Sequence, residues 1–319
     1  MKKILLLISG IALLYQQSHA QDTTKTKGKW DKGGSFNLNF NETGYKNWST
    51  ITDDVINVNG LLSLYAKYAK AKLAWDNNLD LAYGQTMLSS IGAFRKSDDK
   101  IDLTSKLGYK ASEHWFYTGL FNFKTVMTKG FIYGDPTLNT KPKLNSNFLS
   151  PGRVELSLGM DYKPNSSFSL FVSPLSNRLT ICLDTNLTTL YLPVRPGDKQ
   201  KNLTQGGNTY TRYEIGAGLK AKYQKDIMKN VNLKVNFEMF TDYLDKKHNV
   251  DFFGDILIAM KVNKYIGATV GFTTVYDDDI AVPIKGLNNA TNKMDYSAGR
   301  IGPRLQLKHN IGVGFSYKL

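Results

Sequence analysis

Residues 73–84, LAWDNNLDLAYG, alternate between apolar and polar side chains with a period of two. Leu79 and Leu81 fall on one face of this segment, and Asp76 and Asp80 fall on the other. The pattern predicts a β-strand with one apolar and one polar face. A half-buried strand of a soluble sandwich and a strand with one face against lipid both alternate in this way. The segment alone therefore leaves open which solvent each face meets.

The same alternation recurs along most of the chain, and no segment shows convincing helical periodicity. The clearest further examples are residues 36–40, 56–68, 100–110, 153–162, 212–223, 231–239 and 305–317. Beyond the first twenty residues, no stretch approaches 18 uncharged apolar residues, so the sequence predicts no membrane-spanning helix. The pattern predicts an all-β protein.

The connections between these segments alternate strictly between short and long. Tight joints are expected around 70, 112–113, 164–165, 225–229 and 263–264. Longer polar stretches fall at about 42–53, 85–99, 129–148, 185–209, 245–249 and 278–302. A transmembrane antiparallel β-barrel of the outer membrane has short periplasmic turns and longer extracellular loops. A soluble sandwich has no reason to sort its loops by length, so the apolar faces are predicted to meet lipid.

One segment, residues 168–184, breaks the alternation at Pro174. It is either two strands joined at the proline or one long strand whose phase changes at a β-bulge, where a missing N–H is tolerated. Two strands give an odd total of thirteen, whereas one bulged strand gives twelve and places both termini in the periplasm. We predict one bulged strand and twelve strands within a range of 10–14. Asn77 and His309 then fall on the lipid side, which they do not suit.

The first twenty residues predict a secretory signal. Lys2 and Lys3 provide a basic start, residues 4–14 an apolar core, and Ser18-His19-Ala20 a cleavage site with small residues at its first and third positions. Residues 21–32 are then a polar periplasmic lead, too short for a plug domain, and residues 33–319 form the barrel. Export and this fold together predict the outer membrane of a Gram-negative bacterium.

Composition adds two constraints on function. Cys182 is the single cysteine, so no intramolecular disulfide framework exists. The formal net charge is +14, or +12 once Lys2 and Lys3 leave with the signal. Because an exported protein does not meet nucleic acid, lipopolysaccharide or anionic solutes are the expected partners of this charge, and envelope proteins are further candidates.

Several stretches resemble an uncharacterised family of Bacteroidota outer-membrane proteins, domain of unknown function 3078. The resemblance rests on their order and spacing: GGSFNLNFNETGYKNW (33–48), KLAWDNNLDLAYG (72–84), FRKSDDKIDLTSKLGYKAS (94–112), LSPGRVELSLGMDYKPN (149–165), FVSPLSNRLT (171–180) and VYDDD (275–279). After Trp48 the family often has glycines where this chain has Ser-Thr-Ile, so the first loop is expected to differ. The resemblance implies an outer-membrane barrel and no particular activity.

Few residues suggest catalysis or metal binding. His309 lies mid-strand on the predicted lipid side, where a barrel lipid hydrolase would carry its base, but no G-x-S-x-G motif accompanies it. Asp277, Asp278 and Asp279 are weak candidates for a hard cation such as Ca²⁺, and a solvated acidic loop is the better interpretation. No cofactor and no enzymatic activity are expected.

The predicted interior face is rich in charge, with eleven basic and six acidic groups. They are Lys70, Lys72, Asp76, Asp80, Lys100, Asp102, Lys106, Arg153, Glu155, Arg212, Glu214, Lys220, Lys222, Lys234, Glu238, Arg304 and Lys308. These groups form either an ion-paired filling of a closed lumen or the lining of a water-filled, anion-favouring pore. The basic surplus favours a passive channel for small, anionic solutes. A non-conducting barrel that serves as a scaffold in an envelope assembly is the main alternative, and a lipid hydrolase is the second.

Overall fold

The computed structural model of the chain describes residues 28–43, 55–88, 92–132, 142–192, 203–206, 209–244, 249–263, 265–277, 282–283, 286–288, 293–295 and 301–319. The predicted signal peptide at 1–20 lies outside these residues. The first strand begins at Lys29, inside the segment expected to be a polar lead.

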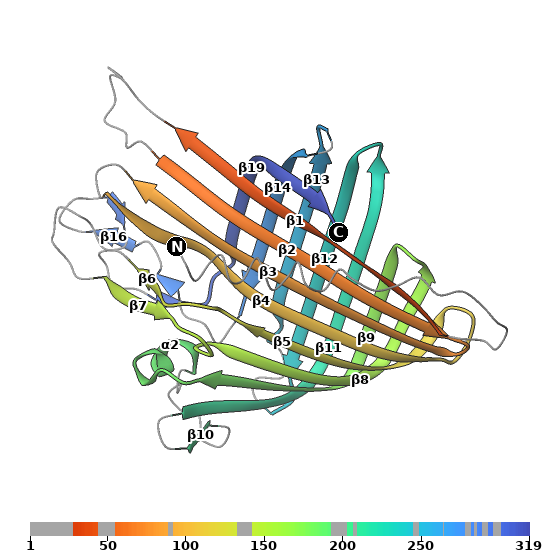
Figure 1. Cartoon of the computed structure of the whole chain (residues 1–319). Helices are drawn as coiled ribbons and strands as arrows, with labels where there is room; N and C mark the ends of the chain where they lie inside the picture. Colours follow the sequence, from red (N-terminus) through yellow and green to blue (C-terminus); the bar gives the residue numbers. More distant parts are fainter. Residues whose placement is uncertain are drawn as a thin grey trace.

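Twelve long strands in the described ranges pair antiparallel with their sequence neighbours and close into a ring (Figure 1). The ring is completed by the pairing of the first strand with the last. Its members are β1 (Lys29–Thr43), β2 (Val55–Lys70), β3 (Leu73–Leu88), β4 (Ala93–Lys110), β5 (Trp115–Thr125), β8 (Gly152–Asn165), β9 (Phe168–Cys182), β11 (Thr209–Met228), β12 (Val231–Asp242), β13 (Asp251–Lys261), β14 (Ile266–Tyr276) and β19 (Gln306–Lys318). The prediction of a closed, twelve-stranded antiparallel barrel is confirmed.

Shorter elements lie outside the ring. They are β6 (Gly130–Ile132) paired with β7 (Lys143–Ser146), β10 (Leu203–Gly206) paired with β11, β15 (Val282–Pro283) paired with β18 (Ile301–Gly302), β16 (Gly286–Asn288) paired with β17 (Lys293–Asp295), and two short helices, η3 (Thr185–Leu187) and α2 (Thr188–Tyr191).

The two ends of the barrel differ in their connections. At the end that we call the short-turn end, β2–β3, β4–β5, β8–β9, β11–β12 and β13–β14 are joined within a few residues. At the opposite, long-loop end, β5 and β8 are separated by residues 126–151, and β14 and β19 by residues 277–305. The prediction of a long polar loop at 85–99 was wrong. Most of these residues form strand, because the β3–β4 ladder continues until Leu88 pairs with Ala93.

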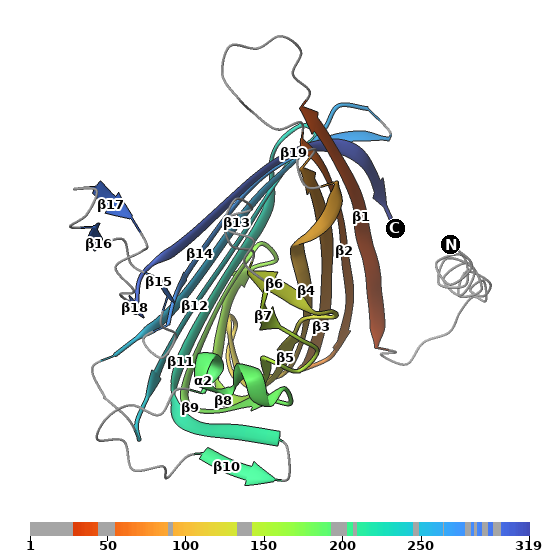
Figure 2. The same cartoon turned by 90° about the vertical axis from the view of Figure 1, so that its left-hand side faces the viewer.

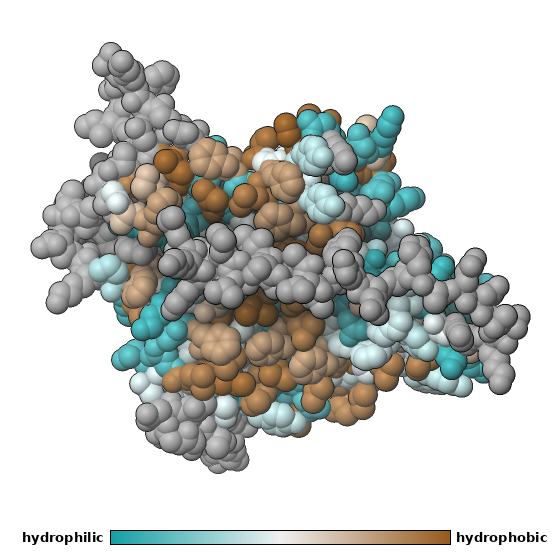
Figure 3. Space-filling view, in the orientation of Figure 1, coloured by the Kyte–Doolittle hydropathy of each residue, from teal (hydrophilic) through white to brown (hydrophobic). Residues whose placement is uncertain are grey.

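The outer surface of the barrel is apolar. Leu107, Leu158 and Phe272 each expose about half or more of their surface, and Figure 3 shows hydrophobic side chains gathered on the visible parts of one face, above and below the residues drawn in grey. Among the described residues, no helix is long and apolar enough to cross a membrane. A belt of large apolar side chains around a closed sheet costs free energy in water and gains it in lipid.

Asn77 lies on this outer face, as expected, but its amide is satisfied locally. Its Nδ2 donates to the backbone oxygen of Ala66 at 3.3 Å, and its Oδ1 accepts from Ser105 Oγ at 2.8 Å. Trp75 Nε1 in turn donates to Ser105 Oγ at 2.8 Å. These three side chains therefore satisfy one another, which lowers the cost of placing polar groups on an apolar surface.

Pro174 marks a β-bulge within one continuous strand, β9, as predicted. On the β11 side, Gly216 pairs with Ser176 while Gly218 pairs with Ser173, so β9 has one extra residue at the proline. The ladder with β8 shifts at the same place. The bulge turns the Ser173 and Ser176 hydroxyls toward each other at 3.0 Å, and both serines are fully buried.

We expect Ser173→Ala to destabilise the barrel through this bulge. Ser173 Oγ lies 2.8 Å from the backbone oxygens of both Leu158 and Leu175, where the regular ladder is interrupted. Leaving buried polar groups without their partner costs about 1–3 kcal/mol. Denaturant unfolding in detergent micelles measures the loss, and the exposed Ser166→Ala is the control. Equal stability of the two variants would contradict the role given to Ser173.

A small core closes over the long-loop end of β8 and β9. Cys182, Leu187 and Leu192 are buried together, with Tyr191 packed against them. Burial raises the pKa of Tyr191 to about 12, so its hydroxyl stays protonated and donates to the backbone oxygen of Asn145 at 2.7 Å. We call η3, α2 and the β6–β7 hairpin the cap; its elements lie together at this end in Figures 1 and 2.

Candidate functional site: the barrel interior

The strand alternation places a row of polar side chains on the inner face of β3. Asp76, Asn78 and Asp80 occupy successive inward positions, because residues i, i+2 and i+4 of a strand share one face. Trp75, on the opposite face, is 39% exposed on the outside of the barrel. This segment therefore has an apolar outer face and a charged inner face.

Each of these three residues receives a lysine from a different strand. Lys163 Nζ of β8 lies 2.6 Å from Asp76 Oδ2. Lys222 Nζ of β11 donates to Asn78 Oδ1 at 3.1 Å. Lys234 Nζ of β12 lies 3.1 Å from Asp80 Oδ2. We call Lys163, Lys222 and Lys234 the lysine row.

The Lys234–Asp80 pair joins opposite walls of the barrel. In the ring of twelve, β3 and β12 are six strands apart in either direction. Lysine and aspartate side chains together extend only about 10 Å, so a 3.1 Å contact between opposite strands requires a flattened cross-section. The pair therefore runs across the interior rather than along the wall.

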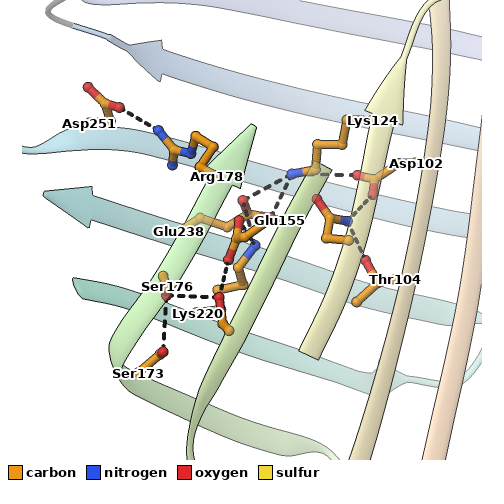
Figure 4. A network of polar contacts seen from close by, with 12 residues as sticks. Asp102, Thr104, Lys124, Glu155, Ser173, Ser176, Arg178, Lys220, Glu238 and Asp251 are labelled. Carbon is orange, nitrogen blue, oxygen red and sulfur yellow. Dashed lines mark hydrogen bonds and ion pairs between the residues drawn. The ribbon is translucent and has the colours of Figure 1, made fainter. Parts of the chain in front are cut away.

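A second group of charges lies nearer the long-loop end, and we call it the carboxylate cluster (Figure 4). Glu238 Oε1 accepts from Lys124 Nζ at 2.8 Å, and Glu238 Oε2 lies 3.4 Å from Lys220 Nζ. The other contacts are Lys220 with Glu155 at 2.9 Å, Lys124 with Asp102 at 3.7 Å, and Arg178 with Asp251 at 2.7 Å. Lys124 and Glu238 stand on β5 and β12, four strands apart in the ring, so this cluster also crosses the interior.

Neutral groups add hydrogen bonds to the cluster. Ser157 Oγ lies 2.9 Å from Glu155 Oε1 and 2.8 Å from Ser176 Oγ, so its hydroxyl can donate to either oxygen. Asn122 Nδ2 donates to Asp102 Oδ1 at 2.8 Å. Buried charges are tolerated when they are paired and hydrogen-bonded. The carboxylates of Glu155, Glu238 and Asp102 meet that condition, whereas the buried Nε of Arg178 has no hydrogen-bond partner among the described residues.

Other candidates lie toward the long-loop opening. Arg153 pairs with Asp277 at 3.3 Å, and Lys308 pairs with Asp98 at 3.0 Å, which joins β19 to β4. Glu214 is buried and lies in register with Arg178. Arg212 lies on β11 in register with Thr180 of β9.

Lys72 and Arg304 stand apart from these groups. Lys72 is exposed in the turn between β2 and β3, and Arg304 is exposed just before β19. Strand phase alone placed both at inward positions, but each lies beyond the end of a strand, where the alternation no longer applies.

Sequence reasoning missed several of the central groups. Lys124, Lys163 and Arg178 each make a cross-strand ion pair shorter than 3 Å, yet none was among the candidates. Arg178 follows the bulge, which changes its phase, and Lys163 is close to a turn. Lys124 lies near the end of an aromatic-rich segment that carries no other charge. The segment therefore shows no alternation of apolar and charged residues that would assign Lys124 to the interior.

The catalytic and metal hypotheses gain no geometric support. His309 is exposed on β19, in register with Phe272, and no described serine makes a hydrogen bond with it. Asp278 and Asp279 lie outside the described residues, and Asp277 pairs with Arg153. No group of three or more His, Cys, Asp or Glu side chains within the described ranges is arranged to hold a metal ion.

A closed antiparallel ring with an apolar exterior and a charged interior defines a transmembrane β-barrel of the outer-membrane type. The sequence model of the family described as "Protein of unknown function (DUF3078)" matches residues 40–131, which confirms the resemblance over that segment. No curated protein matches the chain.

Solved structures with a similar arrangement include three outer-membrane proteins. The translocator domain of autotransporter NalP from Neisseria meningitidis is 9% identical, with a TM-score of 0.37 over 99% of this chain and 94% of that one. The COG4313 outer membrane channel from Pseudomonas putida F1 is 10% identical, with a TM-score of 0.38 over 95% and 100%. The outer membrane channel DcaP of Acinetobacter baumannii is 8% identical, with a TM-score of 0.30 over 94% and 100%. The fold class itself rests on the strand ring and the apolar exterior.

Proposed function

We propose that the protein is a passive outer-membrane channel for small polar solutes, whose bore is divided by ion pairs between its walls. The observation that carries this proposal is the partial exposure of the bridging groups. The side chains of the pairs Lys124–Glu238, Lys163–Asp76 and Lys234–Asp80 keep 16% to 27% of their surface accessible. Water that reaches these charges from within the barrel supports a wet interior rather than a dry plug.

The basic surplus supports a preference for anions. The mature chain has a formal charge of +12 if the predicted signal peptide is removed, and lysines from five strands enter the interior. A narrow lumen lined by one sign of charge raises the local concentration of the opposite ion. The exterior charge is proposed to face lipopolysaccharide, with the short-turn end in the periplasm.

We expect the refolded, purified protein to form small, steady, anion-selective channels in a planar lipid bilayer. The ion pairs that cross the lumen limit the open area, so the conductance should be well below that of a 16-stranded porin. Reversal potentials under a salt gradient measure the selectivity. A correctly folded barrel that passes no current would contradict the channel proposal.

The cap favours a second candidate, a scaffold that presents the long-loop end to an envelope partner. Asp99 holds the segment that leads into the cap, because its carboxylate accepts from the backbone N–H groups of Met127 and Thr128 at 2.7 and 2.9 Å and from Lys96 Nζ, which also contacts Ser146 of β7. A region fastened by this many contacts is suited to recognition. A silent barrel would make this candidate the better one.

A further inference from the structure

We propose that the lysine row forms a binding site for a phosphate-type oxyanion, centred on Lys222 and Asn78 in the short-turn half of the lumen. This inference names the class of solute that the proposed channel would bind. It rests on the proposed function in one respect, because the site requires an interior that solutes can reach. The site would take free inorganic phosphate or the phosphate group of a small solute.

The first argument is the mismatch along β3. Three lysines meet three successive inward positions, but only Asp76 and Asp80 are carboxylates. The middle position is Asn78, a neutral amide, so Lys222 donates to an oxygen without formal charge. Within the residues that the structure describes, no carboxylate lies within salt-bridge distance of Lys222 Nζ. An ammonium group in a narrow, partly desolvated lumen gains free energy from an anion.

The second argument is the local charge balance. Lys67 of β2 and Lys106 of β4 flank Asp76 in register, and Lys106 Nζ contacts Asp161 Oδ2 at 2.6 Å. Asp31 of β1 also lies in register with Lys67, and Lys163 Nζ lies 3.5 Å from Asp161 Oδ2. Of the five lysines Lys67, Lys106, Lys163, Lys222 and Lys234, only Lys222 has no described carboxylate in register with it or within salt-bridge distance. The charge of Lys222 is therefore the one that an oxyanion would neutralise.

The third argument is the convergence of donors. Ser169 of β9 lies in register with Lys222, and its Oγ accepts from Lys106 Nζ at 3.0 Å and donates to Asp161 Oδ1 at 2.6 Å. Because the Asp161 carboxylate already receives the Ser169 hydroxyl and Lys106, the donors that remain for an oxyanion are the Lys222 ammonium group and the Asn78 amide N–H groups. Hydrogen bonds from an ammonium group to an ionised acceptor are the stronger kind.

The carboxylate cluster shows why the site is placed in this half. There, Lys124, Lys220 and Arg178 face four carboxylates, those of Asp102, Glu155, Glu238 and Asp251 (Figure 4). The charge balance is opposite to that of the lysine row. An anion that enters the lumen is therefore held at the short-turn side of this cluster.

Titration calorimetry of the full-length protein in detergent micelles tests the site, with sodium phosphate as the probe and sodium chloride at equal ionic strength as the reference. Asn78→Asp places a carboxylate opposite Lys222 with little change in shape, and Lys222→Gln removes the cation. Each variant should weaken phosphate binding about tenfold or more, the effect of losing one charge-assisted contact. Lys225→Gln, an exposed position on the same strand, makes the same charge change as Lys222→Gln and should bind as the wild type does.

Phosphate binding that Asn78→Asp and Lys222→Gln both weaken supports the site. No binding to the wild type, or equal binding by all four proteins, overturns it. The bilayer recording separates this inference from the channel proposal. A silent barrel that binds phosphate keeps the site and overturns the channel, whereas a conducting barrel without phosphate binding does the reverse.

Discussion

Replacing both Asp80 and Lys234 with alanine is expected to raise the single-channel conductance several-fold. These side chains meet at 3.1 Å from strands six places apart in the ring, so they divide the lumen. Removing them takes away the bridge and its hydrogen bond from Ser63 Oγ to Asp80 Oδ1 at 2.5 Å. The opposite walls then have room to separate toward a rounder, wider bore.

The charge-exchanged variant Asp80→Lys/Lys234→Asp is the matched control for this prediction. It keeps one cation and one anion on the same two strands, so the bridge can re-form and the conductance should stay near the wild-type value. A double-alanine variant that conducts no better than the exchanged variant would show that the pair does not limit the bore.

Glu238→Ala is expected to cause the largest loss of stability of any single substitution in the carboxylate cluster. The Glu238 carboxylate receives both Lys124 and Lys220, and the substitution leaves two ammonium groups with fewer partners inside the barrel. Breaking a fully buried ion pair costs about 3–5 kcal/mol, and since 27% of the Glu238 side chain is exposed we expect about 2 kcal/mol. Denaturant unfolding in micelles, followed by loss of the heat-modifiable folded band on gels, measures the change.

The double variant Lys124→Met/Glu238→Leu separates lost pairing from lost packing. It removes one charge of each sign and keeps similar volume, so it should recover part of the stability that Glu238→Ala loses. Lys220 keeps Glu155 as a partner at 2.9 Å in this variant. A double variant less stable than Glu238→Ala would argue that the charges themselves hold the two walls together.

Local sequence was sufficient for the barrel because each strand carries its own evidence. The alternation of LAWDNNLDLAYG gives both the strand and its two faces, and the break at Pro174 gives the bulge that makes the count twelve. Loop lengths predicted which strand ends are joined by tight turns, and the strand bounds confirm that sorting. The extent of the β3–β4 ladder was missed, since polar residues at 85–99 pair as strands just as well beyond the apolar belt.

The interior contacts were beyond the reach of the sequence for a physical reason. The alternation of apolar and polar residues predicts that Asp80 and Lys234 both point inward. It does not predict which strands lie opposite each other or how far the ring is flattened. Asn78 shows the same limit. As one asparagine among alternating polar residues it is unremarkable, and only its position between Asp76 and Asp80, opposite Lys222, gives it meaning.

The single cysteine of the chain gives the cap a built-in reporter. Cys182 is fully buried beneath η3 and α2, with its thiol directed to the backbone oxygen of Asp184 at 3.2 Å. A maleimide reagent can reach this sulfur only when the cap opens, and no second thiol competes for the label. The labelling rate of the unmodified protein therefore measures how often the cap unfolds locally at the mouth of the barrel.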